Sequence, residues 1–188
     1  MNPETWRTLE AQAQWALAHA DQCPPREALR GMGLQLRLWR YPRSGPHLSW
    51  SLIIPVRDYR GRPAVIREVS WDRSADWQAM MAPMKALKRR TRLVPSVRLR
   101  DANVDWSDLA PFLDAAGRLP ADSLGTDPSL PSEEGGCGLE GFRSLAHIRL
   151  EWAGKGPRGW GATIAWFDQF RRMLVRIMEQ RDTAHGGG

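Results

Sequence analysis

Alternating apolar and polar residues predict several β-strands in this chain. Over residues 47–56, leucine, tryptophan, isoleucine and valine occupy every second position between mostly polar neighbours. This period of two is typical of a strand that buries one face. Short turns rich in glycine and proline separate the first three strands, which indicates an antiparallel meander. The remaining strands are expected at residues 34–39, 65–71, 96–100, 139–142 and 145–152.

Apolar residues spaced at the helical period of 3.6 predict helices. The first covers residues 2–21, and it either packs on the domain or forms an arm that docks on a partner. Another begins with Ser74 as its cap and carries a stripe of methionines, which is more typical of a core than of a binding surface. Pro83 kinks this helix or divides it in two. Further helices are expected at about residues 107–117 and 160–181.

These elements predict a single α+β domain over residues 1–188. Its mostly antiparallel sheet of about six strands is covered by the N-terminal, middle and C-terminal helices. A chain of 188 residues is of ordinary length for one domain and can bury a substantial core. Residues 119–138 are rich in proline, glycine, serine and acidic side chains, so we expect a flexible acidic loop there. Residues 186–188 form a glycine tail.

The chain carries ten tryptophans, far above ordinary usage. Trp50, Trp71 and Trp152 occupy apolar positions in the pattern, so we expect them in the core or on a half-buried sheet. Trp39 falls on the face of its strand opposite the leucines, which favours an exposed contact. An exposed ring at Trp39 or Tyr41 would be suited to stacking on nucleic-acid bases.

The net charge is +6, and all but three of the 27 basic residues are arginines. A positive field of this kind favours acidic proteins or nucleic acids as partners, although a solvated basic surface is the commoner explanation. The densest basic segment follows the methionine-rich helix, where cations also stabilise a helix C-terminus. The candidate partner- and anion-binding residues are Lys85, Lys88, Arg89, Arg90, Arg92, Arg98, Arg100, Lys155, Arg158 and Trp39.

Residues 154–159 match the pattern G-x-G-x-x-G between a predicted strand and a predicted helix. A dinucleotide-binding unit also needs a second parallel strand after that helix, and the sequence has only a few residues beyond it, so we reject this function. Lys155, Arg158 and the free N–H groups of the helix start remain suited to holding a phosphate or carboxylate.

No complete catalytic signature occurs, and we expect neither enzymatic activity nor a cofactor. Cys137 with His147 as its base is a conceivable thiol pair, because a hairpin could bring the two together, but an incidental thiol is the simpler interpretation. The four histidines are scattered without ligand spacing, so no metal is expected. Two distant cysteines, no signal peptide and no long apolar run favour a cytoplasmic location without membrane association.

The segment LEWAGKGPRGW, followed by WFDQFRRML, resembles the C-terminal end of small uncharacterised bacterial proteins. Those proteins also have a strand ending in tryptophan, a Gly/Pro–Gly-Trp turn and an amphipathic helix. The resemblance covers about residues 144–188, with a looser match over residues 97–119. It implies no activity and no catalytic residue.

The working hypothesis is a non-enzymatic bacterial binding or accessory protein, such as an inhibitor or immunity-type protein, that engages an acidic protein partner. The alternative is a nucleic-acid-binding protein that uses the basic patch Lys85–Arg100. Two further hypotheses are a ubiquitin-like modifier that uses the C-terminal glycines 186–188 and a Cys137/His147 thiol enzyme. The sequence does not fix the oligomeric state.

Overall fold

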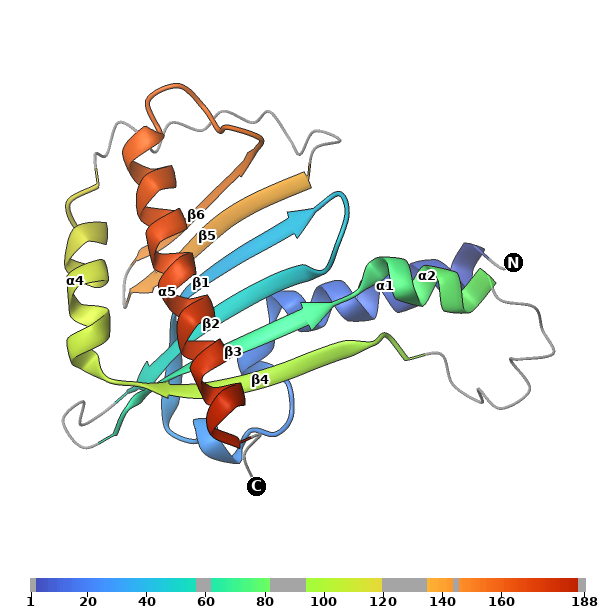
Figure 1. Cartoon of the computed structure of the whole chain (residues 1–188), viewed down its shortest axis with the longest axis horizontal. Helices are drawn as coiled ribbons and strands as arrows, with labels where there is room; N and C mark the ends of the chain where they lie inside the picture. The colour runs from blue at the N-terminus through green and yellow to red at the C-terminus, as the bar shows by residue number, and fades with distance from the viewer. Residues whose placement is uncertain (1–2, 57–61, 82–93, 120–134, 144–145, 186–188) are drawn as a thin grey trace.

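The computed structural model contains a six-stranded antiparallel sheet with helices on both faces (Figure 1). It describes residues 3–56, 62–81, 94–119, 135–143 and 146–185. The strand order is β4-β3-β2-β1-β5-β6. The helices are α1 (Pro3–Ala18), η1 (Ala20–Gln22), η2 (Glu27–Leu29), α2 (Arg73–Met81), α4 (Trp106–Ala116) and α5 (Gly161–His185). The strands are β1 (Met32–Pro42), β2 (His47–Pro55), β3 (Ala64–Trp71), β4 (Val97–Val104), β5 (Gly135–Arg143) and β6 (Ala146–Ala153).

This arrangement confirms the predicted α+β fold, with an antiparallel sheet and N-terminal, middle and C-terminal helices. One predicted boundary is wrong, because residues 135–138 belong to β5 and not to the acidic loop. These residues pair with β1, where Gly135 lies opposite Pro42 and Gly138 opposite Trp39. Gly135 has a φ of 87°, and a Cβ atom there would lie 2.5 Å from the carbonyl oxygen of Tyr41. The glycines that look like loop residues therefore permit close strand pairing.

The larger core lies between the sheet and the two C-terminal helices. In Figure 1, α5 crosses one face of the sheet diagonally, and α4 lies beside it. Leu36 and Leu38 of β1 point to this side, as the period of two predicts. Leu34 packs instead with Leu29, Ile53 and Val65, because the strand register shifts between Leu34 and Leu36. Its main residues are Leu36, Leu38, Trp50, Leu52, Ile66, Leu109, Leu139, Leu150, Trp152, Trp166, Phe167, Phe170, Leu174 and Met178.

A second core lies on the opposite face, beneath α1. The helix buries Trp6, Leu9, Ala13 and Leu17, which recur at the helical period. They pack against Val69 and Trp71 of β3 with Ala20 of η1. The helix therefore packs on the domain, and the tryptophans expected in the core at 50, 71 and 152 are all buried.

Helix α2 is held by a buried carboxylate and by Met80, which packs against the second core. Asp76 is its buried residue, and it accepts hydrogen bonds from the Trp71 indole and the Ser96 backbone N–H, both at 2.8 Å. Met81 is exposed, so the prediction that the methionine stripe is core is wrong for it, whereas Met80 packs on the second core. The rest of the predicted helix, including Pro83, lies outside the described residues.

A row of charged side chains crosses the α1 face of the sheet from one edge to the other. Each member lies directly opposite the next in the strand register, and the charges alternate in sign on both sides of a central serine. We call it the cross-sheet row. Its members, in order, are Arg149, Glu140, Arg37, Ser51, Arg67 and Asp101.

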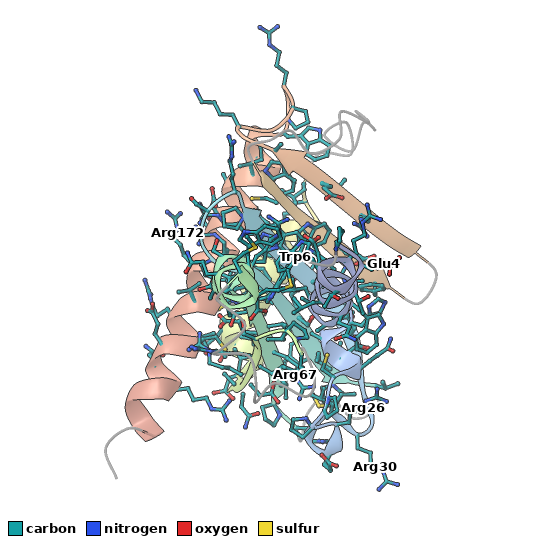
Figure 2. All side chains as sticks on the ribbon, turned by 90° about the vertical axis from the view of Figure 1, so that its right-hand side faces the viewer. Glu4, Trp6, Arg26, Arg30, Arg67 and Arg172 are labelled. Carbon is teal, nitrogen blue, oxygen red and sulfur yellow. The ribbon has the colours of Figure 1, made fainter. Side chains whose placement is uncertain are left out.

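Arg67 is fully buried and all five of its N–H donors are used. Two of them form a bidentate pair with Asp101, with both N–O distances at 2.7 Å. The other three donate to the carbonyl oxygens of Ala20, Cys23 and Pro25, at 3.2, 2.7 and 2.7 Å. One side chain therefore fastens the segment after α1 to the middle of the sheet. Arg67 is labelled in Figure 2.

Arg37 has the same role on β1, two strands away from Arg67. It is buried, forms an ion pair with the buried Glu140, and donates to the carbonyl oxygen of Ala18. Ala18 is the last residue of α1. A guanidinium at this position satisfies a carbonyl that has no partner within the helix and complements the negative end of the helix dipole.

We expect Arg67→Met to lower the free energy of unfolding by about 3–5 kcal/mol, because the substitution leaves a carboxylate and three backbone carbonyls without their buried partner. Urea unfolding followed by tryptophan fluorescence measures this loss. Arg7→Met is the matched control, since Arg7 is exposed on α1. A loss at Arg67 no larger than at Arg7 would contradict this role of the guanidinium.

Candidate functional site

Trp39 is buried, so the prediction that it forms an exposed contact is wrong. Its side chain is 2% exposed although it does lie on the face opposite the leucines. The guanidinium carbons of Arg37 and Arg149 each lie 5.1 Å from the centre of its ring. The ring lies against Gly138 of β5, where an added Cβ would be 2.2 Å from a ring carbon. Two cations and a strand backbone cover the indole, which is a structural use of cation–π contacts.

Tyr41 is also engaged within the fold. Its ring stacks on that of His47, with 5.1 Å between ring centroids, and His47 in turn meets Trp71 edge-on at 5.4 Å. Burial raises the pKa of the Tyr41 hydroxyl to about 12, although the charges of Arg37 and Arg149 act in the opposite direction. Neither Trp39 nor Tyr41 therefore presents an open ring for base stacking.

The structure describes four of the predicted basic residues. Arg98 is exposed on β4. Arg100 pairs with the buried Glu68 at 2.5 Å, and Glu68 also accepts from the Trp50 indole at 2.9 Å. Lys155 and Arg158 are exposed in the turn before α5. The other predicted cations, Lys85, Lys88, Arg89, Arg90 and Arg92, lie outside the described residues.

A polar groove occupies the part of the sheet face beside α5 that holds Arg98. Its volume is about 930 Å³, and its walls come from β2, β3, β4 and α2. The register places Leu48, Ser70 and Arg98 in one line across three strands. Two carboxylates and two guanidinium groups line this groove, and Glu68 pairs with Arg100, so its charges are balanced and favour no ligand class.

A second groove, which we call the helix groove, lies between α4 and α5. Its volume is about 520 Å³, within the range of binding sites for small ligands and short peptide segments. Phe112, Met173 and Ile177 are its half-buried apolar residues, and they form the floor. The rim is polar and consists of Asp108, Gln169, Arg172, Arg176 and Gln180.

The relative position of the two helices creates this groove. Phe112 of α4 packs on Phe170 of α5 with 5.2 Å between ring centroids. The Trp166 indole of α5 donates a hydrogen bond of 2.9 Å to the Phe112 carbonyl oxygen. These contacts hold the helices together at the sheet, while Arg172 extends outward from α5, away from α1 (Figure 2).

The sequence contained part of this signal. Arg172 and Arg176 lie one turn apart, and the helical period places them on the outward side of α5. What periodicity could not show is that α4 lies beside that surface and completes the groove with Phe112. The helix groove was therefore missed because it depends on a contact between segments about 60 residues apart in the chain.

The thiol pair is not assembled in the described geometry. Cys137 lies opposite Trp152, whereas His147 lies opposite Phe142, five residues further along β5. At roughly 3.3 Å per residue this separates the two backbones by about 16 Å. Burial also raises the pKa of the Cys137 thiol, which disfavours the nucleophilic thiolate.

Within the described parts of the chain, no group of three or more His, Cys, Asp or Glu side chains is placed to hold a metal ion. None of the described helices is long and apolar enough to cross a membrane. Comparisons with protein-family models, with curated proteins and with solved structures found no match to this chain. The similarity of its C-terminal segment to small bacterial proteins stays a prediction.

We expect Gly138→Ala to lower the free energy of unfolding by about 1–3 kcal/mol, because the new methyl group would overlap the Trp39 ring and force it out of place. Gly141→Ala in the same strand is the matched control, since a Cβ there meets nothing within 4 Å. Thermal unfolding of both variants measures the difference. Equal stability of the two variants would contradict the described packing of Trp39.

The raised pKa of Tyr41 predicts a loss of stability at alkaline pH. The unfolded chain releases this proton near pH 10 and the folded protein only near pH 12. The contribution to stability is therefore complete below about pH 10 and is lost as pH rises through about 12, by roughly 2–3 kcal/mol. Urea unfolding across this range should show a shallower decline for Tyr41→Phe, and an unchanged decline would contradict the expectation.

Proposed function

We propose that this chain is a non-enzymatic binding protein that engages an acidic protein partner, and that the helix groove receives an acidic amphipathic helix of that partner. The observation that carries the proposal is the combination of an apolar floor with two exposed arginines on its rim. In this proposal the protein acts in the cytoplasm, where Cys23 and Cys137 stay reduced.

The floor favours a partner with a few apolar side chains. Phe112, Met173 and Ile177 are each half-buried, so they retain apolar surface that a partner could cover. Methionine is flexible and polarizable, which lets such a surface adapt to different apolar groups. An amphipathic helix would supply them at helical spacing.

The rim selects the charge of the partner. Arg172 and Arg176 lie one turn apart on α5, and Asp108 is the one acidic residue of the rim. Among the described residues, Arg171 of the same helix pairs with Asp168, whereas Arg172 and Arg176 take part in no ion pair. Carboxylates spaced one turn apart on a partner helix would therefore meet complementary charges that no ion pair among the described residues neutralises.

The length of the groove fits a short helical segment. Its residues on α5 run from Gln169 to Gln180, which is about 16 Å at 1.5 Å per residue. That length corresponds to roughly three turns of a helix lying alongside. A polar rim around an apolar floor is the usual anatomy of a protein interface.

The alternative partner is nucleic acid. Five of the seven residues proposed for it between 85 and 100 lie outside the described residues, and Arg100 already pairs with Glu68. Trp39 is buried and the half-buried Tyr41 ring stacks on His47, so neither of the two rings proposed for base stacking is open. The described residues therefore support the protein partner better.

The test uses labelled synthetic helical peptides of about three turns. One peptide presents leucines on one face with glutamates flanking them, and its control has glutamine at each glutamate. We expect the acidic peptide to bind at least about tenfold more tightly in fluorescence anisotropy, because only its carboxylates can pair with the rim arginines. Arg172→Glu combined with Arg176→Glu should abolish the difference between the peptides.

The matched control is Arg7→Glu combined with Arg43→Glu, which changes the net charge equally at exposed positions outside the groove. It should leave the preference for the acidic peptide unchanged. A shift of the Met173 methyl resonance on binding would localise the peptide. Equal affinity for both peptides would overturn the proposal. Tight binding of labelled oligonucleotides that survives reversal of the groove arginines would favour the nucleic-acid alternative.

A further inference from the structure

The two edges of the sheet differ in how they are protected. At one edge, β4 carries the charged residues Arg98, Arg100 and Asp101, and α5 packs against it. Charges and a covering helix are common means of preventing an edge strand from pairing with another chain. At the other edge, β6 has one described neighbour, β5, and pairs with it along its whole length without a register shift.

The composition of β6 favours further pairing. The strand has no proline or lysine, and Ile148 is 44% exposed at its edge. The period of two places Ile148 on the same face as Leu150 and Trp152, and those two are buried. Ile148 is exposed because no described strand lies beyond β6 to cover it.

The charges of β6 are self-complementary about its centre. Arg149 and Glu151 lie on the same face, one on each side of Leu150, and form a weak ion pair of 3.2 Å within their own strand. If two copies of β6 pair antiparallel about a twofold axis at Leu150, Arg149 of each copy lies opposite Glu151 of the other. The same register places Ile148 opposite Trp152 on the other face.

We propose that two copies of this chain pair through β6 in this register and form one continuous sheet. A second copy fits better than an unrelated chain, because a twofold axis requires a surface that complements itself. Both ion pairs and both apolar pairs arise together from the single register centred on Leu150. The pairing would also cover the exposed Ile148 and satisfy the backbone groups of the open edge.

Charge reversals test this pairing in a way that distinguishes it from a general loss of structure. Arg149→Glu alone places glutamates opposite each other at two symmetric positions, and Glu151→Arg alone does the same with arginines. Each should weaken the dimer by about tenfold or more in sedimentation velocity measured across a range of protein concentrations. The double variant, Arg149→Glu with Glu151→Arg, should restore it.

Mixing the two single variants gives the most specific result. One copy then carries two glutamates and the other two arginines, so the pairing predicts a heterodimer although each variant alone is largely monomeric. Glu151→Arg keeps Arg149 over Trp39, so this variant retains the described packing if Arg149→Glu does not fold. Circular dichroism and thermal unfolding establish the folded state of each variant.

Three outcomes would overturn the proposal. The unmodified protein could remain a monomer at the highest concentration reached, its dimer could survive both single reversals, or the mixture could fail to associate. Arg158→Glu, an equal change of charge at an exposed residue outside β6, is the control and should leave the dimer unchanged.

Discussion

Two arginines buried beneath the N-terminal segment hold that segment on the sheet. Arg37 and Arg67 bind carbonyl oxygens of residues 18, 20, 23 and 25, which end α1 and follow it. Each arginine is neutralised by a carboxylate from a neighbouring strand, Glu140 or Asp101. A buried cation is costly unless it is paired and hydrogen-bonded, so the segment, the arginines and the two carboxylates depend on one another. Arg67 uses all of its donors, whereas the buried Nε of Arg37 has no hydrogen-bond partner among the described residues. The second core then forms because α1 lies where these contacts place it.

The sequence was sufficient for the parts of the fold that rest on periodicity. The meander of β1, β2 and β3 and the closing helix α5 each have a strong pattern of their own, and the structure has them where they were expected. Periodicity was insufficient where contact with a distant segment determines whether a side chain is buried. Arg37 alternates with leucines and looks like an outward polar position, and the presence of α1 over that face makes it buried. Arg67 shares the period-two face of Val65, Val69 and Trp71, and periodicity alone gives no partner for a cation there. Trp39 also looks exposed in the sequence pattern. It is buried because Gly138 and two arginines from other positions cover its ring.

The functional surfaces depend even more on contacts between distant segments. The outward arginines of α5 could be recognised from the sequence, but the apolar floor between α4 and α5 exists only because Phe112 lies beside Met173 and Ile177. Likewise, the alternation in residues 147–152 is the same whether the strand is central or at an edge. The strand order leaves β6 outermost among the described strands, and Ile148 is therefore exposed although it shares a face with the buried Leu150 and Trp152.

The cross-sheet row also restricts how the strands can align. If β3 moved by one residue against its neighbours, Arg67 would turn toward the leucine-rich core under α5 and lose every partner it has. A shift of two residues would keep it on the correct face but place it opposite Leu99 or Asn103 instead of Asp101. Either error leaves a buried cation without a counterion, which costs more than the few hydrogen bonds that a slipped strand could recover. The row therefore acts as a set of register marks across the sheet, and a sheet with many similar apolar residues has one alignment that satisfies all of them.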